Sequence, residues 1–296
     1  MRLGVIGADS SHLPEFSRRI KEMHDEGRTP CRVTHVFDPG DHDWPNPDDV
    51  QKWKNDAAEL GVEPVGTMDD LLAAVDGVLV LAVNGNKHLG LSESSLATGK
   101  PTYVDKPLTC STEEAKTLLA RARSGNARCY SASSLRFATE LERIPRDELG
   151  PIVAIDAFGP GELNPSMPGL FHYGCHTIEM VDAIWGPGVN RVSALETTDR
   201  HLLDMEYGDG RFARLRLDRR AGYEFGATVH GEKGVHQFRV DFGPVYTRLV
   251  EGMVRFFEGG TAPAELRDIV ENVAVMEAGN ASAASQGDWM SVPEIV

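Results

Sequence analysis

Residues 4–12 carry the first side chains whose types suit a ligand site, and they read GVIGADSSH. In dinucleotide-binding proteins a G-x-G-x-x-G turn joins the first strand to the first helix, and its glycines let the main chain approach a pyrophosphate. Gly7 keeps the first glycine of that pattern, whereas Asp9 and His12 stand at the second and third positions. The turn therefore predicts cofactor contacts at Gly7, Asp9, Ser10, Ser11 and His12. The alternative is an ordinary strand-to-helix turn in which Asp9 or Ser10 caps the helix.

Asp38 is the second candidate, because it ends an apolar run at residues 33–38 and precedes Pro39 and Gly40. A carboxylate at the end of the second strand accepts hydrogen bonds from an adenosine ribose and repels a 2′-phosphate. Asp38 therefore predicts NAD as the cofactor, with NADP disfavoured. The alternative role is that of a turn residue at the end of the strand.

Short apolar runs that alternate with amphipathic stretches define the first 130 residues. This alternation is typical of βαβ units, which build a parallel sheet covered by helices on both faces. The expected strands are residues 3–7, 33–38, 77–83, 102–105 and 127–131. The expected helices lie near residues 13–26, 48–60, 68–75, 88–98 and 112–124.

The pattern changes after residue 130 to β-rich runs divided by glycine-containing turns, which indicate hairpins. These runs are residues 152–158, 202–207, 212–217, 224–230 and 235–241, with helices near 175–185, 245–258 and 264–285. Residues 159–169 hold so many glycines and prolines that we expect a loop there. The predicted fold class is α/β: a Rossmann-type doubly wound parallel sheet in a domain of residues 1–130, and an α+β domain with a largely antiparallel open sheet over residues 131–296.

Charge and length limit the classes of partner. The 296 residues include 30 Lys+Arg and 45 Asp+Glu, which gives a formal net charge of −15 and disfavours nucleic acid and anionic membranes as partners. We find no apolar run long enough to cross a bilayer and no secretory segment, so we expect a cytoplasmic location. The four cysteines show no C-x-x-C spacing, and we expect no disulfides.

Two later segments carry a family resemblance. Residues 77–88, GVLVLAVNGNKH, and residues 98–108, TGKPTYVDKPL, resemble the Gfo/Idh/MocA oxidoreductases, which have a strand, a T-P-N-x-x-H-like turn, a helix, A-x-x-x-G-K, a strand and E-K-P in this order. Asp105, Lys106 and Pro107 stand at the E-K-P position. Arg136 and Phe137 resemble the family's R-F pair at the domain junction. Residues 171–186, FHYGCHTIEMVDAIWG, resemble its D-x-G-x-H-x-x-D segment.

The resemblance implies an NAD-dependent oxidoreductase that acts on CH–OH groups of a sugar, polyol or related hydroxylated small molecule. The family's active-site lysine, acid and histidine map to Lys106, His172 and His176, and Glu179 stands at the following acid. A hydride leaves an alcohol carbon only as the hydroxyl proton is lost, so the reaction needs a general base, here His176, and a donor for the oxygen, here Lys106. The histidines lie four residues apart and share one face if their segment is helical, so they suit a proton relay. Further cofactor contacts are expected at Val83, Asn84, His88 and Asp105.

Three positions depart from the family pattern. Asp105 is shorter than the family's glutamate, His172 replaces an aspartate, and Asp9 with His12 replace two glycines. The last departure leaves two other functions open: a non-redox lyase or isomerase that uses Asp9/His12 and His172/His176, and a ligand-binding module without turnover. A metal held by the same four residues is a weaker alternative, and we expect no metal. The family resemblance also implies a homo-oligomer through the open sheet of the second domain.

Overall fold

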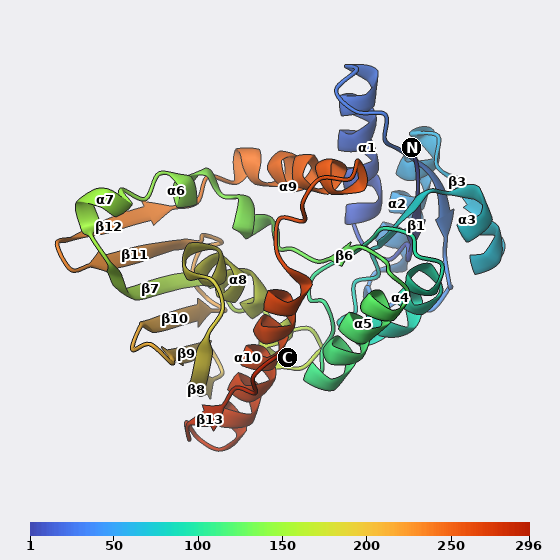
Figure 1. Cartoon of the computed structure of the whole chain (residues 1–296). Coiled ribbons are helices and arrows are strands. Elements are labelled where there is room, and N and C mark those ends of the chain that lie inside the picture. Colours follow the sequence, from blue (N-terminus) through green and yellow to red (C-terminus); the bar gives the residue numbers. More distant parts are fainter. The chain divides into compact units, whose positions relative to one another are not determined.

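The computed structural model describes residues 1–296 as two compact units. The first unit comprises residues 1–109, 113–132 and 249–266, and the second comprises residues 110–112, 133–248 and 267–296. Each unit is built around its own sheet (Figure 1). None of the helices combines the length and the apolar character that a membrane span requires.

The first unit is built on a six-stranded sheet in the order β3-β2-β1-β4-β5-β6, in which every pair of neighbouring strands is parallel. Because β2 and β4 flank β1, the strand order reverses at β1, and in open α/β sheets ligands bind at such a switch point. The elements are β1 (Arg2–Ile6), α1 (His12–Asp25), β2 (Arg32–Phe37), α2 (Pro47–Glu59), β3 (Glu63–Val65), α3 (Met68–Ala74), β4 (Gly77–Val80), η1 (Gly85–Lys87), α4 (His88–Ala97), β5 (Thr102–Val104), α5 (Thr112–Ser124) and β6 (Cys129–Tyr130).

Helix α1 shows how the sequence builds this unit. Leu13, Phe16, Ile20 and Met23 recur every three or four residues and are all buried, while the polar residues between them form ion pairs within the helix. The ring of Phe16 meets the edge of Tyr103, a fully buried residue of β5, at a centroid distance of 6.4 Å. This contact joins the start of α1 to the residues just before Asp105.

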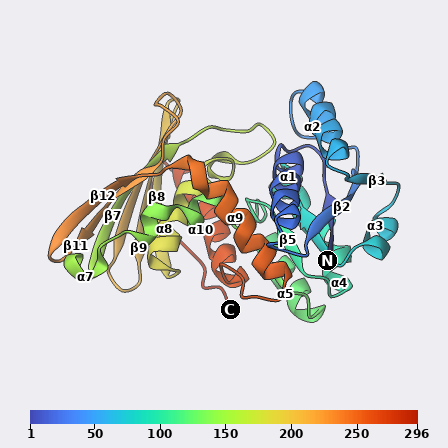
Figure 2. The same ribbon diagram turned by 90° about the horizontal axis from the view of Figure 1, so that it is seen from above.

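The second unit contains a seven-stranded sheet in the order β12-β11-β7-β10-β9-β8-β13. Strands β7 and β10 are parallel, and the other neighbours are antiparallel. Helices α8 and α10 lie on the same side of this sheet (Figure 2). The elements are η2 (Ser134–Phe137), α6 (Thr139–Glu142), α7 (Arg146–Leu149), β7 (Ile152–Pro160), η3 (Gly169–Phe171), α8 (Gly174–Trp185), β8 (Val189–Thr197), β9 (Arg200–Tyr207), β10 (Phe212–Asp218), β11 (Gly226–Gly231), β12 (Gly234–Arg239), α10 (Leu266–Ala284) and β13 (Met290–Ser291). Helix α9 (Phe242–Phe257) begins in the second unit, and its residues from 249 onward belong to the first.

The predicted fold class is confirmed, and the differences lie in single elements. The prediction lacked strands β3, β8 and β13. The loop expected over residues 159–169 is wrong at its start, because Gly159 and Pro160 belong to the central strand β7. Proline is tolerated there because it ends β7 and lies beyond the pairing with β11, which stops at Phe158. Gly159 is needed because a Cβ atom would lie 2.4 Å from Oγ1 of Thr177.

Candidate active site

The carboxyl ends of four parallel strands bring most of the predicted cofactor residues of the first unit to one edge of its sheet. Gly7 follows β1, Asp38 follows β2, and Asp105 follows β5. Val83 and Asn84 lie in the turn after β4. Because these strands are neighbours in one sheet, residues that are up to about 100 positions apart in the sequence meet at its ligand-binding edge.

Gly7 makes the turn after β1 possible. Its φ of +94° is a conformation that side chains with a Cβ atom rarely adopt, and an added Cβ would lie 2.6 Å from the main-chain nitrogen of Ala82. Its N–H donates to the carbonyl of Phe37 at 3.0 Å, which fixes the turn against the end of β2. The glycine that the dinucleotide pattern retains is therefore required by the structure.

Asp9 binds main-chain amides of two other loops. Its Oδ1 accepts the N–H of Val83 at 3.1 Å and its Oδ2 accepts the N–H of Asp43 at 2.9 Å, and the residue is 2% exposed. It therefore does not cap α1, whose N-cap residue Ser11 makes no side-chain cap bond. Ser10 performs part of that role, because its Oγ accepts the N–H of His12 at 3.2 Å.

His12 pairs with Asp105 inside the first unit. Nδ1 of His12 lies 2.5 Å from Oδ2 of Asp105, and both residues are buried. The other carboxylate oxygen accepts the hydroxyl of Tyr103 at 3.2 Å and the N–H of Lys106 at 2.9 Å. Burial alone would raise the pKa of Asp105, but the contacts with His12 and Lys106 outweigh it and lower the pKa to about 2. Asp105 is thus a carboxylate near neutral pH.

Asp38 keeps its negative charge beside two basic side chains. Its Oδ2 accepts from Nζ of Lys54 at 2.6 Å, and its Oδ1 pairs with Nε2 of His42 at 2.8 Å and accepts the N–H of Gly40 at 2.9 Å. Burial opposes ionisation, yet these bonds lower the pKa of Asp38 below its usual value. The predicted ribose acceptor is therefore ionised, with a lysine at its side.

In and just after the turn that follows β4, the side chains of Asn84 and His88 bond to the protein's own main chain. Oδ1 of Asn84 accepts the N–H of Asn86 at 3.0 Å, which starts η1. His88 is fully buried, with Nε2 at 2.7 Å from the carbonyl of Ala82 and Nδ1 at 2.8 Å from that of Pro107. Its ring therefore holds the two strand-end turns together, and we leave it out of the proposed ligand contacts.

In the second unit, His176 lies in the first turn of α8 and pairs with Ser133. Its Nδ1 is 2.7 Å from Oγ of Ser133, which also accepts the N–H of Leu135 at 3.1 Å. The N–H of Ser133 donates to Glu179 at 2.8 Å. Glu179 also accepts from Nε of Arg136 at 2.9 Å. Burial raises the pKa of Glu179, against the attraction of that guanidinium.

His172 does not share a helix face with His176, because α8 begins at Gly174 and His172 precedes it. The ring of Tyr173 contacts both, at centroid distances of 4.9 Å from His172 and 5.6 Å from His176. The hydroxyl of Tyr223 donates to that of Tyr173 at 3.3 Å, and Tyr223 is 55% exposed. Burial raises the pKa of Tyr173, so its hydroxyl is uncharged around neutral pH.

Sequence reasoning assigned no role to Ser133, Tyr173 or Tyr223. Ser133 lies in an ordinary serine-rich run, and Tyr223 is 50 residues away from the tyrosine that it contacts, so neither carries a local signal. Of the predicted catalytic residues, Lys106 belongs to the first unit and His172 and His176 belong to the second. Their convergence on one substrate stays a prediction.

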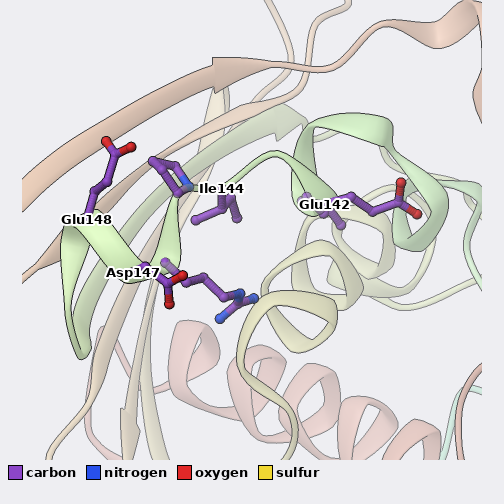
Figure 3. Close-up of a pocket in the computed structure, with 7 residues that line it drawn as sticks. Glu142, Ile144, Asp147 and Glu148 are labelled. Carbon is purple, nitrogen blue, oxygen red and sulfur yellow. The ribbon is translucent and has the colours of Figure 1, made fainter.

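A hollow of about 470 Å³ in the second unit is lined by residues of α6, α7 and the segment between them (Figure 3). Glu142, Asp147 and Glu148 give it an acidic rim. It contains none of the candidate residues, and we assign it no function.

The protein consists of two units. The parallel sheet of the first unit and the residues at its strand ends have the Rossmann-type arrangement of dinucleotide-binding enzymes. Residues 1–133 match the model of the Gfo/Idh/MocA family, described as an oxidoreductase family with an NAD-binding Rossmann fold. Over residues 1–133 the chain is therefore similar to the Gfo/Idh/MocA oxidoreductases.

Individual relatives are distant. Inositol 2-dehydrogenase of Cereibacter sphaeroides is 28% identical over 179 residues, which are 58% of this chain and 48% of that protein. The chain spans about half the length of the curated relatives it matches. The WlbA dehydrogenase of Bordetella pertussis, solved with NADH and UDP-GlcNAcA, has a TM-score of 0.81 at 16% identity over 99% of this chain and 98% of that one. Levoglucosan dehydrogenase, solved with NADH and L-sorbose, has a TM-score of 0.79 at 16% identity over 100% of this chain and 99% of that one. At such identities the structures show the shared fold.

Proposed function

We propose that this chain is an NAD-dependent oxidoreductase that transfers a hydride between the nicotinamide and a sugar, polyol or related hydroxylated small molecule. The observation that carries the proposal is the gathering of the Gly7 turn, Asp38 and the Asp105–Lys106 pair at the carboxyl edge of one parallel sheet. That edge is where such sheets bind dinucleotides.

The residues at this edge fit a nicotinamide dinucleotide. The Gly7 turn leaves no room for a Cβ atom, and the ionised Asp38 supplies the acceptor that a ribose requires. Asp9 brings a negative charge to the turn, but two main-chain N–H groups already bind its carboxylate. The main chain at Ser10 and Ser11, at the start of α1, remains the proposed phosphate contact, because helix N-termini favour anions.

Lys106, His172 and His176 form the proposed catalytic set. When bound, the nicotinamide supplies the hydride acceptor. The ammonium of Lys106 stabilises the charge that develops on the substrate oxygen, and His176 hydrogen-bonds the same hydroxyl. The ring of Tyr173 contacts both His172 and His176, which supports a role for the two imidazoles at the same substrate site.

The aromatic cluster of the second unit supports a sugar or polyol as the substrate. Tyr223 offers an exposed ring and a hydroxyl linked to Tyr173. A sugar ring presents C–H groups on one face and hydroxyls at its edge, so it suits an aromatic surface beside hydrogen-bonding groups. The relatives named for inositol and levoglucosan are consistent with this class.

The test is NADH formation, followed by absorbance, with a panel of polyols, sugars and sugar acids. We expect turnover with at least one panel member, and we expect Lys106→Met to lower kcat/KM by about 10²–10³-fold, the usual effect of losing a donor to a developing oxyanion. Lys52→Met is the control, because Lys52 lies on the exposed face of α2. No NADH with any panel member, or an unchanged Lys106→Met, would count against the proposal.

A second candidate function is a non-redox lyase or isomerase reaction. The buried His12–Asp105 pair favours it, because such a pair suits proton abstraction without a dinucleotide. Consumption of a panel compound in the complete absence of added or co-purified dinucleotide, detected by NMR, would identify this alternative.

A further inference from the structure

Asp38 is joined to two segments of the first unit that each carry a tryptophan. Its carboxylate pairs with Nε2 of His42 at 2.8 Å in the loop after β2, and with Nζ of Lys54 at 2.6 Å in α2. Trp44 lies two residues after His42. Trp53 is the residue before Lys54. The indole rings of Trp44 and Trp53 meet edge to face with their centroids 5.2 Å apart. Both partners of the carboxylate are thus within two residues of one aromatic pair.

The loop that carries Trp44 is held at two further points. The N–H of Asp43, the preceding residue, donates to Oδ2 of Asp9 at 2.9 Å. Nζ of Lys87 pairs with the carboxylate of Asp43 at 2.6 Å and donates to the carbonyl of Asp41 at 2.7 Å. Asp9 follows β1, and Lys87 follows β4. These contacts tie the loop after β2 to two neighbouring strand ends, so Trp44 is held in place at the ligand-binding edge of the sheet.

The indole of Trp44 has a fixed orientation and an accessible part. Its Nε1–H donates to Oδ2 of Asp49 at 2.9 Å, in the first turn of α2. Trp44 and Trp53 are both half-buried. A pair that served packing alone would gain most from complete burial. A half-buried indole whose polar group is already bonded within the protein instead offers an apolar aromatic surface to a ligand.

We propose that the indole of Trp44 forms one wall of the site for the adenine ring of the dinucleotide. This assignment rests on the proposed function and gives a role to a residue that sequence reasoning left without one. In a bound dinucleotide the adenine is attached to the same ribose whose hydroxyls bind the carboxylate at the end of the second strand, here Asp38. The base is therefore one sugar ring away from Asp38. Adenine is flat and aromatic, and such bases stack on aromatic side chains.

A wall for adenine predicts a distinct pattern of affinities. It contributes equally to every ligand that carries an adenosine, and it contributes nothing to nicotinamide mononucleotide. ADP-ribose has the adenosine and both phosphates of the cofactor but lacks the nicotinamide. Binding of ADP-ribose therefore reports on the adenine site without any hydride transfer.

The first test uses tryptophan fluorescence of the full-length protein titrated with ADP-ribose. The chain has four tryptophans, of which Trp185 and Trp289 belong to the second unit. We expect saturable quenching in the wild type, in Trp53→Phe and in Trp289→Phe, because an adenine stacked on an indole quenches its emission. Trp44→Phe should lose the quenching but still bind ADP-ribose by calorimetry, because phenylalanine keeps an aromatic face. No quenching in the wild type, or quenching of full amplitude in Trp44→Phe, would overturn the proposal.

The second test measures affinity by calorimetry. Trp44→Leu keeps an apolar side chain without an aromatic face, and we expect the dissociation constants of ADP-ribose and NAD each to rise about tenfold, within the usual range for base–aromatic stacking. The dissociation constant of nicotinamide mononucleotide should stay unchanged. Trp289→Leu is the matched control, because Trp289 is 41% exposed and lies in the second unit. Equal affinities of the wild type and Trp44→Leu for ADP-ribose would assign Trp44 to packing against Trp53.

This proposal and the proposed function fail in different ways. If ADP-ribose binds with quenching that depends on Trp44 but no NADH forms with any compound of the panel, the adenine wall stands and hydride transfer is wrong. If NADH forms but Trp44→Leu binds NAD like the wild type, the oxidoreductase proposal stands and the role of Trp44 is wrong. Circular dichroism of Trp44→Leu separates loss of fold from loss of stacking, and the fluorescence of the milder Trp44→Phe decides the matter if Trp44→Leu does not fold.

Discussion

Asp38 is the residue on which the proposed choice of NAD as cofactor depends. It pairs with Lys54 and His42, so the carboxylate that repels a 2′-phosphate is accompanied by groups that would attract one. The proposed preference for NAD over NADP thus rests on the negative charge of Asp38, which offsets the positive charge of Lys54.

We expect Asp38→Ser to shift the binding preference from NAD toward NADP. The variant loses an acceptor for the ribose and leaves Lys54 available to the phosphate, so NAD should bind about tenfold more weakly and NADP about tenfold more tightly, roughly 1.4 kcal/mol each. Equilibrium dialysis with both nucleotides measures the change. Asp56→Ser, on the exposed face of α2, is the control. An unchanged ratio of the two dissociation constants would remove Asp38 from the site.

At the residue scale, the sequence predicted which side chains lie at the carboxyl edge of the first unit's sheet, but not which groups of the protein they pair with. The position of Asp9 in the turn is readable from the motif, whereas its partners Val83 and Asp43 lie in separate loops that meet it only in the folded chain. The pairing of His12 with Asp105 spans 93 residues in the same way. Tertiary contacts of this kind leave no periodic pattern in a single sequence.

At the element scale, long segments with a clear period were predictable and short or irregular strands were not. β3 has three residues, one of them Pro64, and lies at the edge of its sheet. β8 pairs with β9 through an irregular register between Val189 and Arg191, which interrupts the alternation that a strand prediction needs. Helix α1 was predictable within a residue or two because its apolar positions recur with the helical period.

The seven-stranded sheet carries a row of exposed apolar side chains. Leu195, Leu202 and Phe158 are 49%, 38% and 36% exposed. Leu195 is directly opposite Leu202, and Arg216 is opposite both Leu202 and Phe158, so the four residues cross β8, β9, β10 and β7 on one face. We propose that this face binds a second copy of the chain, since apolar rows of this kind mark association surfaces.

We expect Leu202→Asp to weaken self-association at least about tenfold, because burying a leucine contributes roughly 1.5–3 kcal/mol. Light scattering coupled to size exclusion over a range of protein concentrations measures the effect. Leu163→Asp is the control, because Leu163 is as exposed but lies in the loop after β7. A wild-type protein that is monomeric at all concentrations would refute the proposed interface.

At the scale of the whole molecule, the net charge of −15 works against an anionic cofactor. Binding of a dinucleotide must then depend on local donors at the sheet edge, because at about 0.15 M salt charges further than about 8 Å away are largely screened.

The fold class was predictable from the alternation of strands and helices. The division into domains at residue 130 and the cooperation of Lys106 with His176 stay predictions, because they concern how the units work together.

The central claim is that the chain binds NAD, and calorimetric titration of the full-length protein with NAD tests it most directly. We expect saturable heat with a dissociation constant in the micromolar range. Asp9→Asn should bind NAD more tightly, because it removes a charge beside the proposed pyrophosphate site while its amide oxygen keeps an acceptor for one of the two N–H groups, of Val83 and Asp43, that Asp9 binds. Asp69→Asn, in the exposed first turn of α3, should bind like the wild type. The absence of heat in both the wild type and Asp9→Asn would contradict the account and favour the reaction without a dinucleotide.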